Sequence, residues 1–396
     1  MNIQKLNRAV SAAIGKVFKM KTKHKIILGA ATAFTATATG VAIAKTNQAK
    51  KQERSLKSLL IEDAVKRAAA ATRRDINIEE AMENSQKPFV LPSAARKNLG
   101  MTELDELTDT FVMQPEDVTC DTTIFYLHGS DFWGNPSRVH YAFLKKLVSK
   151  TGAKLVMPVY PKAPAHTATE IQQMILDRYL YLVNEKEIPG EQIVFIGDAA
   201  GGGLALAILQ KLRYLALPLP RQAILISPWL DITNSNPEIE ALTKIDSVLN
   251  VERLAVKGAH YAGDLELTHP SVSPIYGDLN GLPKITVIVG SREIFCADAV
   301  KLEKMAQEQQ LDIEVIVYKN QMHFFPALPI PEAEDVMAII ASELYGVEEV
   351  ELLPDEAEEA EDPAEDEEAN EAEAEIAEAA DEVVADEAAD ETPVTE

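Results

Sequence analysis

Short apolar runs alternate with longer amphipathic ones along residues 89–347, and this alternation restricts the possible folds more than any other feature of the chain. The short runs are rich in β-branched residues and predict strands near 122–127, 153–159, 192–196, 222–227, 284–289 and 312–318. Apolar residues spaced by three and four predict helices near 137–150, 168–184, 202–215, 297–310 and 331–345. Such an alternation forms a mostly parallel sheet with helices on both faces, whose sites lie at the carboxyl ends of the strands.

The turn after the strand predicted at 192–196 is the strongest local sign of a functional site. It reads G-D-A-A-G-G-G over 197–203 and leads directly into a helix. This is the strand–turn–helix setting of the nucleophile elbow, G-x-S-x-G, in which the central side chain is held strained toward a pocket. Gly197 and Gly201 meet the need for small residues, but the centre is Ala199, whose methyl group cannot attack a carbonyl carbon.

Several blocks of the chain resemble, in order and spacing, the bacterial esterases similar to hormone-sensitive lipase, a group of α/β-hydrolases. The elbow resembles the G-D-S-A-G-G of that group. Four other blocks agree with it over roughly residues 89–345, namely Y-L-H-G-S-D-F at 126–132, P-V-Y-P-K-A-P at 158–164, I-S-P-W-L-D at 226–231 and V-S-P-I-Y-G-D at 272–278. The resemblance implies an α/β-hydrolase fold with a small helical lid, built by residues before the first strand and by 235–265.

The same resemblance implies an acid and a base. Glu293 follows the strand at 285–289, where the family has its carboxylate, and His323 follows the last strand, where the family has its catalytic histidine. The chain order of nucleophile, acid and base is that of α/β-hydrolases. The alternatives are a solvated loop histidine at His323 and a surface ion pair between Glu293 and Arg292 or a nearby lysine.

The oxyanion loop, which the resemblance places at His128 and Gly129, departs from the family. By position, the N–H groups that stabilise the oxyanion would be those of Ser130, Asp131 and Ala200. Side chains at 130 and 131 restrict the backbone where the family has glycine, and a carboxylate at Asp131 opposes a developing negative charge. The nucleophile position and the oxyanion loop are thus both altered. This favours a natural site that has degenerated over a single Ser-to-Ala change.

Three functional hypotheses follow. The first is a catalytically impaired pseudo-esterase that binds an acyl, ester-like, lipid or small apolar ligand, or serves as a protein-interaction platform. The second is an active carboxylic-ester hydrolase in which His323 activates water or Ser130 acts as a displaced nucleophile. Asp198 is the other nucleophilic side chain nearby, but we expect it to point away from the pocket and therefore discount it. The third gives the hydrolase body the role of a spacer between two unusual ends.

Cofactors, metals and nucleic acids are not expected as partners. The glycines at 201–203 lack a following G-K-[ST], and neither a dinucleotide fingerprint nor a cluster of metal ligands occurs in the sequence. The basic residues concentrate near the N-terminus and not on an aromatic-rich body surface, which disfavours nucleic-acid binding. Cys120 and Cys296 form no C-x-x-C pair, and we expect two unpaired core thiols, with one long-range disulfide as the alternative.

The N-terminus has the pattern of a membrane-targeting segment. Residues 1–25 contain seven Lys or Arg and no acid, and 26–44 are 19 residues without a charge. This length can just cross a bilayer, and the basic flank keeps the N-terminus in the cytoplasm. Either 26–44 is a signal anchor that leaves the body outside the cytoplasm, or cleavage after Ala44 secretes it. Residues 45–84 are then a juxtamembrane helix or linker.

The hydrolase domain is expected over 85–347 and an acidic low-complexity tail over 348–396. The tail holds 24 Asp and Glu and no Lys or Arg, so it accounts for most of the net charge of −25. It lacks the apolar content to form a core, and we expect it to be disordered. It is either a solvating tail or an arm that binds a basic partner or divalent cations.

Overall fold

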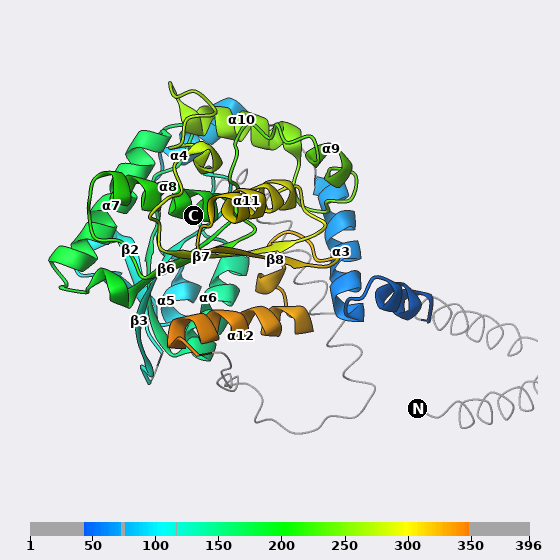
Figure 1. Cartoon of the computed structure of the whole chain (residues 1–396), viewed down its shortest axis with the longest axis horizontal. Coiled ribbons are helices and arrows are strands. Elements are labelled where there is room, and N and C mark those ends of the chain that lie inside the picture. Colours follow the sequence, from blue (N-terminus) through cyan, green and yellow to red (C-terminus); the bar gives the residue numbers. More distant parts are fainter. Residues whose placement is uncertain (1–42, 73–75, 116, 348–396) are drawn as a thin grey trace, which may run out of the picture. The chain divides into compact units, whose positions relative to one another are not determined.

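A computed structural model of the protein describes residues 43–72, 76–115 and 117–347 (Figure 1). The basic segment 1–25, most of the proposed membrane segment 26–44 and the acidic tail 348–396 therefore lie outside the described residues. The chain divides into two compact units, Met1–Leu56 and Lys57–Glu396. In the first unit a helix covers 43–51. No helix of the described residues has the length and apolar character needed to span a bilayer.

An eight-stranded sheet forms the centre of the second unit, in the order β1-β2-β4-β3-β5-β6-β7-β8. Its strands are β1 (Thr102–Leu104), β2 (Leu107–Met113), β3 (Cys120–Leu127), β4 (Ala153–Pro158), β5 (Ile193–Asp198), β6 (Gln222–Ile226), β7 (Lys284–Gly290) and β8 (Ile313–Tyr318). The strands from β3 to β8 pair in parallel, whereas β1 and β2 are antiparallel. The six predicted strands and the mostly parallel sheet are confirmed.

The central strands are continuous apolar runs because helices cover both of their faces. Every residue of β5 and of β6 is buried. The strands β1 and β2 were not predicted, because β1 is only three residues long and the first half of β2 is polar and partly exposed. The antiparallel edge of the sheet therefore carries a weaker sequence signal than its parallel centre.

Five long helices cover the sheet, and all five were predicted. They are α6 (Arg138–Thr151), α7 (Ala168–Asn184), α8 (Ala199–Tyr214), α11 (Cys296–Gln309) and α12 (Pro331–Tyr345). Figure 1 shows α6 and α12 on one face and α8 and α11 on the other, and a separate apolar cluster fills each side. The start of α8 was predicted three residues too late, because the glycine-rich turn itself forms the first helical turn.

One more long helix, α3 (Leu56–Thr72), and several shorter elements surround this frame. The shorter elements are α4 (Ile78–Ser85), α5 (Ser93–Asn98), α9 (Ile239–Leu242), α10 (Val251–Ala262) and the 3₁₀ turns η1 (Gly190–Gln192), η2 (Pro274–Tyr276) and η3 (Phe325–Ala327). The helices α9 and α10 lie in the predicted lid segment 235–265. In α10, the side chain of Asn250 caps the N-terminus through the N–H of Arg253 (2.9 Å), and the carbonyl of Lys257 accepts a hydrogen bond from the Trp133 indole (3.2 Å). These contacts place the lid over the oxyanion loop.

The two cysteines are both buried and unpaired, as predicted. Cys120 begins β3 and Cys296 begins α11, so they belong to opposite apolar clusters. The fold of this unit is therefore held by its packing and not by a disulfide.

Candidate active site

The elbow joins β5 to α8, and Ala199 stands at its apex. Ala199 has a φ of 45°, in the left-handed region, and is 4% exposed. Gly201 allows the turn to approach the neighbouring strand: a Cβ at this position would collide with the carbonyl oxygen of Leu127 on β3. The chain thus forms the strained turn of a nucleophile elbow and presents a methyl group where a hydroxyl would act.

Glu293 and His323 lie together beside this elbow. His323 Nδ1 is 2.5 Å from Glu293 Oε2, and the carboxylate is fully buried. The second oxygen, Oε1, accepts hydrogen bonds from Ser227 Oγ (2.7 Å) and from the N–H of Gly290 (2.8 Å). Arg292, the alternative partner of Glu293, instead pairs with Glu62 at 3.0 Å. The geometry is that of an acid that orients a base.

The pKa of His323 lies above its ordinary value of 6.5. Burial alone would lower this pKa, but the charge of Glu293 and its hydrogen bond to the ring outweigh burial. Because Nδ1–H donates to Glu293, Nε2 is the nitrogen left for the pocket. Among the described residues no hydrogen-bond partner of Nε2 is found, although the His323 side chain is only 9% exposed.

Ser227, at the carboxyl end of β6, was not predicted to act in the site. Its hydroxyl donates to Glu293 and accepts the N–H of Phe324 at 3.1 Å, so it fixes the acid loop and the base loop to each other. The only sign in the sequence was its place at the end of a strand, in the I-S-P-W-L-D block.

The oxyanion loop has the positive φ angles that favour glycine, although the residues at these positions are not glycines. Ser130, Asp131 and Phe132 have φ values of 75°, 52° and 68°. Each such conformation costs a residue with a side chain on the order of 1–3 kcal/mol, so the surrounding structure must impose it. The carbonyl of Ser130 accepts the N–H groups of Trp133 (3.0 Å) and Gly134 (2.9 Å), which closes the loop.

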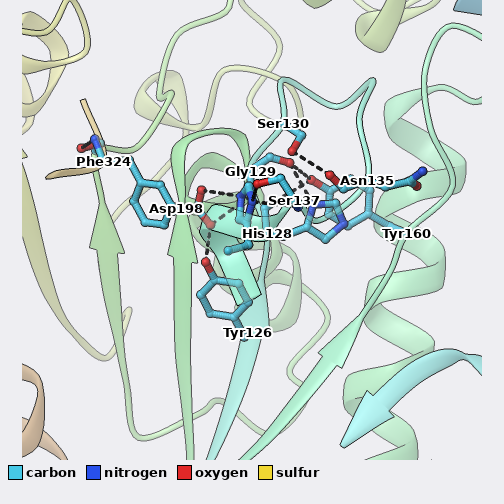
Figure 2. A network of polar contacts seen from close by, with 11 residues as sticks. Tyr126, His128, Gly129, Ser130, Asn135, Ser137, Tyr160, Asp198 and Phe324 are labelled. Atoms are coloured by element: carbon cyan, nitrogen blue, oxygen red, sulfur yellow. Dashed lines mark hydrogen bonds and ion pairs between the residues drawn. The ribbon is translucent and has the colours of Figure 1, made fainter. Parts of the chain in front are cut away.

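Asp198 holds the oxyanion loop against the elbow (Figure 2). Its buried carboxylate accepts hydrogen bonds from the hydroxyl of Tyr126 (2.5 Å), the N–H of Gly129 (3.0 Å) and Nε2 of His140 (3.2 Å). Burial raises the pKa of Asp198, but the charge of His140 and these hydrogen bonds outweigh it, so the pKa is lowered. A Cβ on Gly129 would collide with this carboxylate. Although Asp198 borders the pocket, its oxygens are therefore engaged by the protein.

His128 lies beneath the loop as a neutral, packed side chain. Its ring stacks on Tyr160 at 4.2 Å, and the Tyr160 hydroxyl donates to the carbonyls of His128 (2.6 Å) and Gly129 (3.0 Å). Full burial, followed by the charge of His140, lowers the pKa of His128 to about 3. This residue therefore supports the loop and carries no charge at neutral pH.

The resulting pocket has a volume of about 80 Å³ and contains Ala199, Ser130, Asp131 and His323 in its lining. The other lining side chains that bear on ligand binding are His140, Val248, Leu249, Lys257 and Leu328. Lys257, on α10, is 3.3 Å from the carboxylate of Asp131. The sequence identified the lid segment but none of these lid residues, because its contacts depend on how the lid folds over the sheet. Ala200 is fully buried in the first turn of α8.

Comparisons with known proteins identify the family of this chain. A family model described as an alpha/beta hydrolase fold matches residues 124–327. An esterase of Acinetobacter venetianus is 33% identical over 222 residues, which cover 55% of this chain and 73% of that protein. An acetyl-hydrolase of Streptomyces hygroscopicus is 29% identical over 52% of this chain and 70% of its own length. The chain belongs to the hormone-sensitive-lipase-like group of the α/β-hydrolase family.

A solved structure supports the fold independently. The crystal structure of an esterase from the bacterial hormone-sensitive lipase family has a TM-score of 0.64 to this chain and 24% sequence identity. The match covers 74% of this chain and 98% of that one. The α/β-hydrolase fold is thus shared over nearly the whole length of that esterase.

Proposed function

We propose that this protein is a pseudo-esterase, which binds an acyl, ester-like or small apolar ligand and forms no acyl-enzyme. The observation that carries the proposal is Ala199 at the apex of the elbow, in the same pocket as the paired His323 and Glu293. An acyl intermediate needs a nucleophilic side chain, and loss of the nucleophile in a triad of this kind lowers kcat by about 10⁶. The pocket, the acid and the base then serve binding.

The alternative is an active carboxylic-ester hydrolase that uses Ser130 or a water molecule. The hydroxyl of Ser130 donates to the carbonyl of Asn135 at 3.1 Å, and the described residues include no hydrogen bond from it to His323 (Figure 2). A raised pKa at His323 reduces the fraction of neutral imidazole that could take a proton from water at neutral pH. Both observations favour the binding function.

A fluorophosphonate probe separates these two functions. We expect no covalent adduct on the unmodified full chain after incubation and peptide mapping by mass spectrometry. We also expect no turnover of p-nitrophenyl butyrate that depends on His323, as judged against His323→Ala. An adduct on Ser130, or turnover that His323→Ala abolishes, would establish the enzyme instead.

We also propose a location for the protein. The hydrolase domain lies outside the cytoplasm, where it is either tethered by residues 26–44 or released by cleavage after Ala44. The support is the basic flank 1–25 and the 19 uncharged residues that follow it. Protease added to intact cells should digest the body, and membrane pellets should retain it if the anchor is uncut. A body protected until the cells are lysed would contradict this location.

The acidic tail 348–396 is proposed to keep the protein soluble or to bind a basic partner. Its support is the run of 24 acidic side chains without a Lys or Arg. Deletion of the tail should abolish the capture of a polylysine probe at low salt. Equal capture with and without the tail would leave the body as the binding surface and refute this role.

A further inference from the structure

We propose that the pocket at Ala199 selects a short-chain carboxylic acid, bound as its carboxylate, over the corresponding ester. This inference rests on the proposed loss of the nucleophile, because it assigns a ligand to the space that a serine hydroxyl would fill. Three groups carry it: the backbone of the oxyanion loop, the free nitrogen of His323 and Lys257 on the lid.

The oxyanion loop supplies backbone donors without acceptors. Ser130, Asp131 and Phe132 are three successive residues with positive φ, and consecutive N–H groups in such conformations form a concavity that binds anions. Within the described part of the chain, the N–H groups of Ser130 and Asp131 donate to no acceptor, although the carbonyl and hydroxyl of Ser130 are both bonded within the loop. The contact between Gly129 and Asp198 fixes this arrangement in advance of any ligand.

His323 supplies a second donor, which the methyl group of Ala199 leaves without a partner. In a serine hydrolase Nε2 pairs with the serine hydroxyl. Here Nδ1–H is bonded to Glu293, and the side chain is more than nine-tenths buried with Nε2 toward the pocket. Glu293 favours the imidazolium form, in which Nε2 carries a proton to donate. Because His323 lines the pocket, an oxygen of a bound ligand can accept the hydrogen bond from this N–H.

The charges around the pocket are compatible with a bound anion. Asp131 alone would oppose it, but the ammonium of Lys257, itself 7% exposed, lies 3.3 Å from the Asp131 carboxylate and offsets its charge. The other carboxylate at the pocket, that of Asp198, is bonded to Tyr126, Gly129 and His140. Neither carboxylate is therefore an unpaired charge facing the ligand.

A carboxylate matches these donors better than an ester does. It has two charged oxygens, one for the backbone concavity and one for Nε2–H, and charge-assisted hydrogen bonds are about twice as strong as neutral ones. An ester offers one carbonyl oxygen and one weakly accepting alkoxy oxygen. The pocket volume of about 80 Å³ exceeds the roughly 10–15 Å³ that one water needs on this measure, so it can hold a small acyl chain. Val248, Leu249 and Leu328 line the space for the alkyl part.

Calorimetric titration of the full chain with butyrate, butyramide and ethyl butyrate tests the selection. Butyramide has nearly the shape of the acid but no charge, and ethyl butyrate is the ester. We expect butyrate to bind at least tenfold more tightly than either neutral compound. Equal affinities, tighter binding of the ester, or no binding of butyrate would each overturn the inference.

Two matched variants locate the binding. His323→Gln keeps a polar side chain but cannot carry the charge, and it should weaken butyrate binding at least tenfold. His269→Gln makes the same change at an exposed position outside the pocket and should leave the affinity unchanged. Equal affinity in His323→Gln and the unmodified chain would overturn the inference.

The same samples distinguish a failed inference from a failed proposed function. If the ester binds without turnover and the acid does not, the pseudo-esterase remains and the selection for acids is wrong. If the unmodified chain hydrolyses ethyl butyrate and His323→Gln does not, the pseudo-esterase itself is wrong, and the selection for the acid is refuted with it.

Discussion

At the scale of single residues, the Glu293 carboxylate and the His323 ring are paired beside an elbow that carries Ala199 at its apex. Glu293 is completely buried, and three groups bond to its two oxygens: the His323 ring, the Ser227 hydroxyl and the Gly290 N–H. Such a carboxylate is costly to bury without partners, so loss of any one of these three groups should destabilise the site. The sequence identified both members by position, but it could not show that Ser227 joins their loops.

Replacing Glu293 with Gln should move the titration of His323. In the unmodified chain the pKa of His323 lies above 6.5, and the charge and hydrogen bond of Glu293 are the largest causes that oppose burial, so the pKa should fall in Glu293→Gln. The ring protons followed by NMR between pH 4 and pH 9 give both midpoints. Glu308→Gln, at an exposed position on α11, is the control. A midpoint that does not change in Glu293→Gln would show that the two side chains are not coupled.

The raised pKa of His323 also determines how the free energy of unfolding changes with pH. A histidine whose folded pKa is raised stabilises the fold fully below its unfolded pKa of 6.5, and this stabilisation is lost as the pH rises through the folded value. The free energy of unfolding of the unmodified chain should therefore fall over this window relative to that of Glu293→Gln. Urea unfolding at pH 5.5 and pH 8.5 measures the difference.

At the scale of elements, the helix α3 is fastened to the loops that carry the acid and the base. Ser58 donates to Gln321 at 2.8 Å, two residues before His323, and Glu62 pairs with Arg292 at 3.0 Å, one residue before Glu293. The carbonyl of Gln321 also accepts the N–H of Arg292 at 3.0 Å. The sequence predicted helical character before residue 84 but not these contacts, because they join positions more than 200 residues apart.

Arg292→Ala should be strongly destabilising because it removes one partner of the buried Glu62. Loss of one member of a buried ion pair costs about 3–5 kcal/mol, and the remaining contact with Lys66 at 2.8 Å places the expected loss near the lower end. The matched control is Arg96→Ala, which breaks the pair with Glu103 on the exposed surface and should cost much less, because solvent screens an exposed pair. Urea unfolding measures both, and equal losses would refute the role assigned to α3.

At the scale of the whole molecule, the parallel centre of the sheet, its five long covering helices and the proximity of the candidate site residues at its carboxyl edge could be predicted from the sequence. Their signals are local: β5 is continuously apolar, and the elbow follows it directly in the sequence. What could not be predicted depends on long-range contacts, such as Lys257 beside Asp131 and Asp198 beneath Gly129. The left-handed backbone of Ser130 and Asp131 also escaped prediction, because only the surrounding structure imposes it.

We propose that the methyl group of Ala199 is what prevents catalysis in a site whose acid, base and oxyanion-loop backbone are assembled. Hydrolysis of p-nitrophenyl acetate should be measured with the unmodified chain, Ala199→Ser, Ala216→Ser and Ala199→Ser combined with His323→Ala. Ala216→Ser adds the same hydroxyl at an exposed position outside the pocket and is the matched control. We expect turnover at least tenfold above that of the unmodified chain in Ala199→Ser alone, and its loss in the combined variant. Turnover by the unmodified chain that matches Ala199→Ser and disappears in His323→Ala would contradict it.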